Sequence, residues 1–208
     1  MKSENYFETR KTVIIGLLTA VLILMALTPL GYLNIGPLSI TFNMIPVAIG
    51  TVAAGKKGGT ILGGVFGLTS FLSCMGIIVP LQPFGAALLE INWFFTFILC
   101  FGTRILTGFI LGVLSESVFN KISGNVLKYS LFGFFAAFFN TLFFMTALVL
   151  LFGKTEYIQS IWQSMANGKN VIFFICAFVG VNFVAEIISS TILTSIISCG
   201  LSKAKLIK

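Results

Sequence analysis

Residues 28–50 read TPLGYLNIGPLSITFNMIPVAIG, and this stretch separates two strongly apolar runs of the chain. Two prolines and two glycines between positions 29 and 37 break any helix there, and residues 35–42 alternate roughly as an extended segment would. Because lipid cannot satisfy irregular backbone, such a segment must be buried in protein or reach water. We therefore expect residues 28–44 to form a loop folded over the mouth of a cavity. An ordinary extracellular turn that covers no ligand is the alternative.

The composition is that of an integral membrane protein. Of 208 residues, 57% are hydrophobic and 9% are charged, and the mean hydropathy is +1.06, whereas soluble domains carry about 25% charged residues. The length of the apolar runs favours helices over a β-barrel, whose strands alternate over about 10 residues. The net charge of +7 does not indicate nucleic-acid binding, because the bases lie at the ends of apolar runs rather than in one cluster.

The chain contains neither His nor Asp. Histidine bases, histidine metal sites and Ser-His-Asp triads are therefore excluded, and no metal or cofactor is expected. Cys74, Cys100, Cys176 and Cys199 lie singly in apolar runs without metal-binding spacing. We interpret them as small packing residues.

Six apolar segments predict six transmembrane helices in one membrane domain, residues 1–208. They cover residues 13–27, 45–54, 58–79, 92–114, 131–152 and 171–200. The first resembles a secretory signal, but no convincing cleavage site follows, so we expect it to be retained. Glycines spaced by four residues, at 59, 63 and 67 and again at 108 and 112, predict smooth ridges for close helix contact.

The distribution of bases predicts cytoplasmic N and C termini. With that orientation ten bases lie inside and two, Lys154 and Lys169, lie outside, in agreement with the positive-inside rule. The inner set is Lys2, Arg10, Lys11, Lys56, Lys57, Lys121, Lys128, Lys203, Lys205 and Lys208. Residues 28–44, 76–91 and 153–170 then face outward.

Two charged residues lie near the middle of predicted spans. Arg104 is the only base and Glu186 the only acid at such depth, and each should face the interior of the bundle or a wet cavity. They can pair with each other or contact a ligand. Asn182 precedes Glu186 by one helical turn, so both share one face. Asn140 stands alone in the run FGFFAAFFNTLFFM, where it can bridge helices or bind a ligand.

Further candidates lie at the outer ends of the predicted helices. Thr41 and Asn43 belong to the loop of residues 28–44, and Asn92 and Trp93 begin the fourth span. Trp93 can equally be an aromatic anchor at the membrane interface.

The whole pattern resembles the substrate-binding S components of energy-coupling factor (ECF) vitamin transporters. The resemblance is carried by the quoted stretch, by AGKKGGTILGGVFGLTSF, by RILTG, by FFNTLFF and by GVNFVAEIISSTILT, in that order and spacing over nearly the whole chain. Within that family the sequence looks most like the pantothenate-type S components, and folate and riboflavin relatives share several of these pieces.

The resemblance implies a vitamin-binding subunit in a prokaryotic plasma membrane. It implies a pocket near the outer face under the lid loop, a membrane coupling (T) subunit and two ATPase subunits as partners, and no ATPase site in this chain. Asn140 and Asn182 fall at positions that bind the ligand in riboflavin relatives. Gly16 and Ala20 match small residues that dock on the coupling subunit, although Leu24 departs from that pattern.

Two other functional classes make different predictions. A proton- or sodium-coupled secondary transporter would need a titratable relay, for which Glu186 is the sole intramembrane acid, and inverted repeats, which the sequence does not show. An intramembrane enzyme lacks its usual catalytic residues here. The absence of a GxxxxGK[ST] motif means that energy must come from partners or from a gradient.

Overall fold

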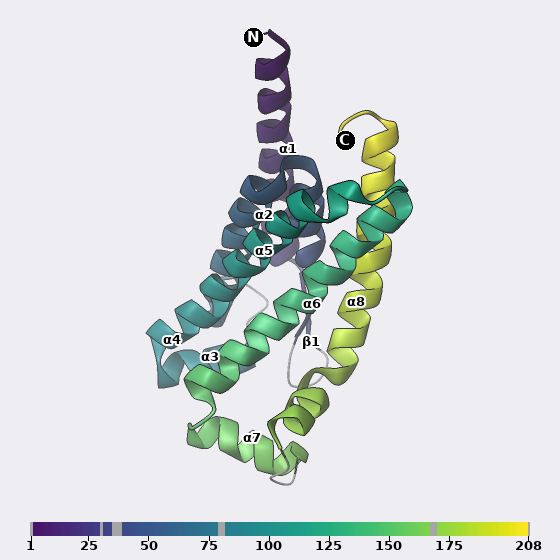
Figure 1. Cartoon of the computed structure of the whole chain (residues 1–208). Helices are drawn as coiled ribbons and strands as arrows, with labels where there is room; N and C mark the ends of the chain where they lie inside the picture. Colours follow the sequence, from purple (N-terminus) through teal and green to yellow (C-terminus); the bar gives the residue numbers. More distant parts are fainter. Residues whose placement is uncertain (1, 30, 35–38, 79–81, 167–169, 208) are drawn as a thin grey trace.

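The computed structural model describes residues 2–29, 31–34, 39–78, 82–166 and 170–207, and it is helical apart from one short hairpin (Figure 1). The elements in chain order are α1 (Lys2–Ala26), β1 (Tyr32–Asn34), β2 (Ser39–Thr41), α2 (Met44–Cys74), α3 (Pro83–Ile91), α4 (Trp93–Phe97), the π-helix η1 (Ile98–Gly102), α5 (Thr103–Ser117), the 3-10 helix η2 (Phe119–Lys121), α6 (Asn125–Phe152), α7 (Glu156–Ala166) and α8 (Val171–Lys203).

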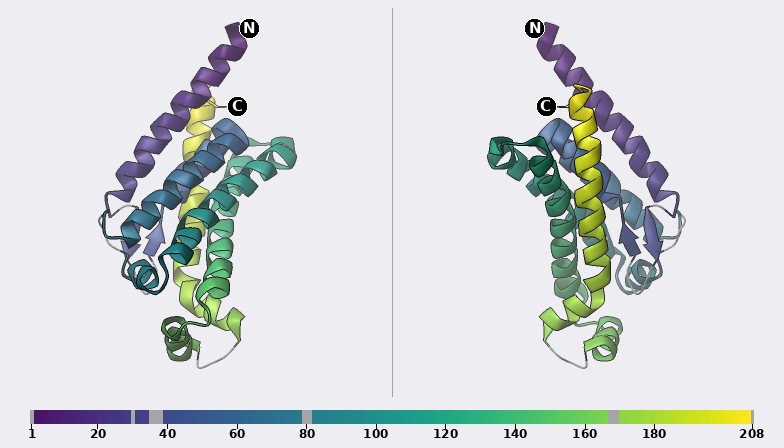
Figure 2. Two further views of the ribbon diagram at one scale, coloured as in Figure 1. Left: turned by 90° about the vertical axis from the view of Figure 1, so that its left-hand side faces the viewer. Right: turned by 90° about the vertical axis from the view of Figure 1, so that its right-hand side faces the viewer.

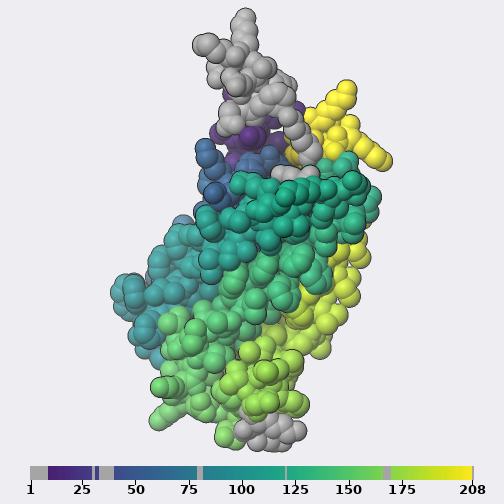
Figure 3. Space-filling model, viewed as in Figure 1, coloured from purple at the N-terminus to yellow at the C-terminus, as the bar shows by residue number. Residues whose placement is uncertain are grey.

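Four stretches are long and apolar enough to cross a membrane. They are Thr9–Ala26, Trp93–Ser117, Asn125–Phe152 and Val171–Lys203. The protein is thus an all-helical integral membrane protein. The beginning of α1 and the end of α8 lie at the same end of the molecule (Figure 2), and α7 closes the opposite end (Figure 3).

Helix α2 consists of two halves that fold back on each other at Gly55. This residue has φ 60° and ψ −144°, a conformation that glycine adopts readily. A Cβ on Gly58 would collide with the carbonyl group of Gly50, so the halves touch beside the break. The sequence predicts separate segments at residues 45–54 and 58–79, and the break lies between them.

The second half of α2 packs closely against α5 through the glycines that the sequence singles out. A Cβ on Gly63 would collide with the carbonyl oxygen of Arg104 in α5, and one on Gly67 would lie 2.7 Å from the Cα of Phe101 in the adjoining η1. Gly59 and Gly108 face each other's carbonyl oxygens in the same way. The predicted glycine ridges are therefore confirmed as the surfaces where these two helices meet.

Two helices lie in segments that the sequence analysis treats as outer loops. Helix α3 falls within residues 76–91, and α7 falls within residues 153–170. The apolar face of α7 is anchored by Ile158, which is fully buried, and by Trp162, whose ring stacks 5.1 Å from that of Phe174. The fourth predicted span is also modified, because η1 interrupts it between α4 and α5.

The apolar side chains form two clusters with a polar layer between them. The cluster nearer the termini includes Leu22, Phe66 and Phe132, and the cluster at the other end includes Leu99 and Phe174. Asn140 on α6, Arg104 on α5 and Glu186 on α8 each fall between the parts of the chain that join the two clusters, and Asn182 lies one turn before Glu186. The fold thereby concentrates its buried polar side chains in one layer.

Candidate ligand-binding site

The polar layer lines a small inner cavity. Arg104, Asn140, Asn182 and Glu186 reach it from three helices, and each is 5–8% exposed. The cavity measures about 60 Å³. The described residues that line it are Tyr32, Thr41, Gln82, Arg104, Asn140, Thr141, Phe144, Val179, Asn182, Phe183 and Glu186. The structure therefore brings together five of the residues that the sequence singles out, including Thr41.

Glu186 fastens the hairpin to α8. Its Oε1 atom accepts a hydrogen bond of 2.8 Å from the backbone N–H of Thr41, at the end of β2. Antiparallel pairing of β1 with β2 places Tyr32 opposite Thr41, so the side chains of this pair share one face of the hairpin. A buried carboxylate thus holds the loop that the sequence predicts as a lid, across 145 positions of sequence.

Arg104 is held by its own helix and by two aromatic rings. Its Nη1 donates to the carbonyl oxygen of Leu99 at 2.9 Å and to Thr103 Oγ1 at 3.2 Å. Its guanidinium lies 5.3 Å from the ring centre of Phe66 and 4.7 Å from that of Phe144, within cation–π range. The adjoining π-helix shifts the helical hydrogen-bond pattern at Leu99, a device often found at functional sites.

Arg104 and Glu186 do not form the direct pair that the sequence allows. Among the residues that the structure describes, no ion pair joins them, because Glu186 bonds to the hairpin and Arg104 bonds to Leu99. Both nevertheless line the inner cavity. The cavity therefore has a cationic wall and an anionic wall.

Several polar atoms on the cavity wall have no hydrogen-bond partner in the protein. They are the hydroxyl of Tyr32, Nε2 of Gln82, Nε of Arg104 and Oδ1 of Asn140. Buried polar atoms are nearly always hydrogen-bonded, and each exception calls for an explanation. These three donors and one acceptor belong to residues that line a single cavity, where a polar ligand would supply partners.

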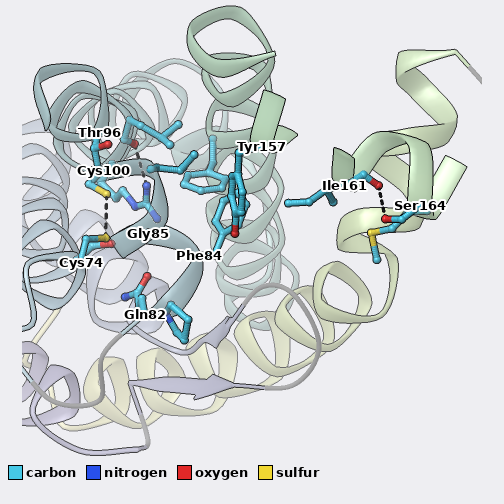
Figure 4. A pocket seen from close by; sticks show the side chains of 16 residues that line it. Cys74, Gln82, Phe84, Gly85, Thr96, Cys100, Tyr157, Ile161 and Ser164 are labelled. Carbon is cyan, nitrogen blue, oxygen red and sulfur yellow. Dashed lines mark hydrogen bonds between the residues drawn. The ribbon is translucent and has the colours of Figure 1, made fainter. Parts of the chain in front are cut away.

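A larger outer cavity adjoins the inner one. It measures about 450 Å³ and shares Gln82, Arg104 and Phe144 with the inner cavity. Figure 4 shows α3 contributing Phe84, which lies beside Tyr157 of α7, with the ring centres 6.1 Å apart. Ligand pockets usually measure roughly 300–1,000 Å³. The inner cavity alone is too small for a vitamin, and the two together are adequate.

Several lining residues were missed by sequence reasoning. The hairpin alternation could have indicated Tyr32, once its pairing with Thr41 was known. Gln82 lies between two prolines in an outer segment and carries no signal of its own. Phe144 is one of many phenylalanines, and only its place beside Arg104 distinguishes it.

Three predicted site residues lie outside both cavities. The Asn43 side chain donates to the carbonyl oxygen of Gly31 at 3.4 Å and so closes the base of the hairpin. The Asn92 side chain accepts from the N–H of Phe95 and caps α4, and Trp93 is 66% exposed. Asn43, Asn92 and Trp93 thus lie apart from the residues that the two cavities bring together, because the first two are bonded to local backbone and the third is exposed.

The predicted docking face on α1 is open. Gly16 and Ala20 are exposed, and a Cβ on Gly16 would meet no atom within 4 Å. The residues of α1 that face the bundle are Leu18, Leu22 and Ala26, which are buried. A small-residue surface thus remains available on the outer side of this helix.

The arrangement suits a small amphiphilic ligand that carries an anionic group. Arg104 offers charged donors, Glu186 and Asn140 offer acceptors, and Val179 and Phe183 supply apolar surface. The described residues contain no group of three or more Cys, Asp, Glu or His that could hold a metal ion.

Two comparisons with known proteins match nearly the whole chain. The model of the family described as "ECF transporter, substrate-specific component" matches residues 10–198. The chain is also 28% identical, over 201 residues, to the curated protein named "Pantothenic acid transporter PanT" from Lactococcus lactis subsp. cremoris (strain MG1363). That alignment covers 92% of this chain and 93% of the relative.

Proposed function

The chain belongs to the family of ECF transporter substrate-specific components, a multi-pass protein of the prokaryotic plasma membrane, and from this premise we propose that it binds pantothenate for uptake. The observation that carries the proposal is that Arg104 and Glu186 line one cavity together with residues whose buried polar atoms have no partner in the protein. The alignment to a relative named as a pantothenic acid transporter supports the same substrate.

The two charges fix the orientation of the vitamin. Pantothenate carries one carboxylate, one amide and two hydroxyls. Its carboxylate binds Arg104, whose side chain lines both cavities, because Glu186 would repel it. The hydroxyl end then enters the inner cavity, where Glu186 and Asn140 accept hydrogen bonds and Asn182 lies one turn from Glu186.

The hairpin acts as the lid in this proposal. Glu186 holds Thr41 at the inner cavity, so opening the hairpin breaks a buried hydrogen bond to a charged group. Such bonds contribute about 1.5–3 kcal/mol. The lid consequently stays closed until entry or release of the vitamin.

The proposed topology has six spans and cytoplasmic termini. The spans are α1, the two halves of α2, α4 to α5, α6 and α8. It rests on the base distribution and on the beginning of α1 and the end of α8 lying at the same end of the molecule (Figure 2). In intact cells, a single cysteine replacing Lys121 should be protected from an impermeant thiol reagent, and one replacing Ser160 should react. The reverse labelling would overturn this orientation.

ATP hydrolysis by partners drives uptake in this proposal. The chain has no Walker A motif, and the partners are a membrane coupling subunit and two ATPase subunits. The open face of Gly16 and Ala20 is where the coupling subunit packs.

Calorimetric titration of the purified protein tests the substrate directly. Pantothenate, riboflavin and folate are titrated in parallel, and mass spectrometry identifies any ligand that co-purifies. We expect saturable 1:1 binding of pantothenate alone. Binding of riboflavin or folate in its place would reassign the substrate while keeping the class, and uptake by the isolated chain driven by an ion gradient would reject the class.

A further inference from the structure

A third cavity lies at the end of the molecule that holds the termini. It measures about 510 Å³ and is formed by α1, the first half of α2, the end of α8 and the residues that follow α8. Its basic lining residues are Arg10, Lys11 and Lys205, and its apolar wall includes Ile14, Val52 and Ile207. Neither of the cavities of the ligand site shares a lining residue with it.

The chain turns sharply after α8 to place Lys205 at this cavity. The N–H of Leu206 donates to the Leu201 carbonyl at 2.8 Å, and that of Lys205 donates to the Ser202 carbonyl at 2.9 Å. This is a Schellman motif, in which glycine usually occupies the position of Lys205. Lys205 has φ 56°, and it is the one non-glycine residue with positive φ among those described. Beyond the turn, Ile207 is buried in the core.

A lysine in a position that favours glycine indicates that its side chain has a use there. Residues held in unfavourable backbone conformations persist where the surroundings or a function require them. A capping role alone would be served better by glycine, and the neighbouring Lys203 already supplies a cation in the last turn of the helix.

The basic residues lie at the ends of apolar spans, where lipid headgroups are expected. Arg10 and Lys11 begin the apolar span Thr9–Ala26, and Lys205 follows the end of the span Val171–Lys203. The cavity therefore joins the cations at these span ends to apolar walls. A phospholipid matches both features, because its phosphate can bind the cations and its acyl chains can cover the apolar walls. A free inorganic anion would contact only the cations.

We propose that this cavity binds one anionic phospholipid, with its phosphate between Arg10 and Lys205 and the upper part of its acyl chains against Ile14 and Val52. The site is independent of the vitamin site and of the proposed docking face. Ile14 lines the cavity, while Gly16, half a turn away, is exposed with no neighbour within 4 Å.

The test counts lipid molecules bound to the full chain by native mass spectrometry from detergent micelles. Dioctanoyl phosphatidylglycerol is compared with dioctanoyl phosphatidylcholine, and glycerol phosphate is the headgroup control. We expect one tightly held phosphatidylglycerol that equimolar glycerol phosphate does not displace. Lys205→Gly should weaken it about fivefold, the effect of roughly 1 kcal/mol for one lysine at an anionic surface, without lowering the melting temperature.

Lys203→Ala is the matched control, because it removes a charge two positions away that does not line the cavity. It should bind phosphatidylglycerol as the wild type does. Equal loss in both variants, or no loss in Lys205→Gly, would overturn the site in favour of general surface charge. Displacement by glycerol phosphate would show an anion site rather than a lipid site. Pantothenate titration of Lys205→Gly should match the wild type, so the lipid site and the vitamin site are tested separately.

Discussion

Replacing Glu186 with alanine should release the hairpin from α8. In the structure the carboxylate accepts the Thr41 N–H at 2.8 Å, and both residues are buried. The variant removes the acceptor and leaves this N–H either unpaired in the interior or exposed by opening of the hairpin. Either outcome shifts the lid away from the closed state.

The expected magnitude follows from the type of bond. A hydrogen bond to a charged group contributes about 1.5–3 kcal/mol, and about 1.4 kcal/mol is a factor of ten in an equilibrium constant. If closure is required for binding, Glu186→Ala should weaken pantothenate affinity roughly 10- to 150-fold. Glu186→Gln keeps an acceptor oxygen and loses only the charge. The affinity of this variant for pantothenate should therefore fall about fivefold, which corresponds to a loss of about 1 kcal/mol in binding free energy.

Two measurements separate lid fastening from direct ligand contact. Amide hydrogen exchange of residues 39–43 is followed without vitamin, and affinity is measured by calorimetry. Glu186→Ala should accelerate exchange at Thr41 even in the absence of ligand, because the fastening is internal to the protein. Ser189→Ala is the control: its hydroxyl bonds to carbonyl oxygens of its own helix, and it lines neither cavity of the site.

Wild-type exchange at residues 39–43 together with wild-type affinity in Glu186→Ala would refute the reasoning. Wild-type exchange with weakened affinity would keep Glu186 as a ligand contact and remove its role in the lid. Thermal melting of each variant is recorded alongside, so that a folding defect is recognised as such.

Three further predictions concern the pocket, the packing and the docking face. Arg104→Gln should weaken pantothenate at least tenfold but leave binding of pantothenol, which has a hydroxyl in place of the carboxylate, nearly unchanged by calorimetry; equal losses would contradict the proposed orientation. Gly63→Ala should lower the free energy of unfolding by about 1–3 kcal/mol, because the new methyl collides with α5, whereas Gly64→Ala meets its nearest atom at 3.7 Å and should be tolerated in the same melting assay. Gly16→Leu combined with Ala20→Leu should reduce co-purification of the coupling subunit and preserve vitamin binding; unchanged co-purification would argue against this face.

Much of the fold follows from local patterns in the sequence. Apolar length sets where helices cross the membrane, and the four-residue spacing of Gly59, Gly63 and Gly67 sets where α2 approaches α5. The cost of charge in hydrocarbon also requires Arg104 and Glu186 to face inward, as they do. These properties depend on residues near one another in the chain, which is why they could be predicted.

The sequence was less informative about the outer end of the molecule. Helix α3 lies in a segment with two prolines and α7 lies in a polar segment, and both helices are too short to carry a spanning signal. Their apolar faces are stabilised by the outer cluster around Phe84 and Phe174, to which several other elements contribute. Because short helices depend on tertiary packing more than on propensity, these two could not be derived locally.

The choice of partners for the buried charges was decided by the tertiary structure alone. By composition, Arg104 and Glu186 are the natural pair, yet Arg104 bonds to Leu99 and Glu186 bonds to Thr41. The sequence determined that two opposite charges would be buried in one bundle. Whether they touch depends on the rotation and axial offset of two helices and on the path of a hairpin 145 positions away, and no local periodicity encodes these quantities. Because each charge is held separately, a cavity with two walls of opposite charge remains between them.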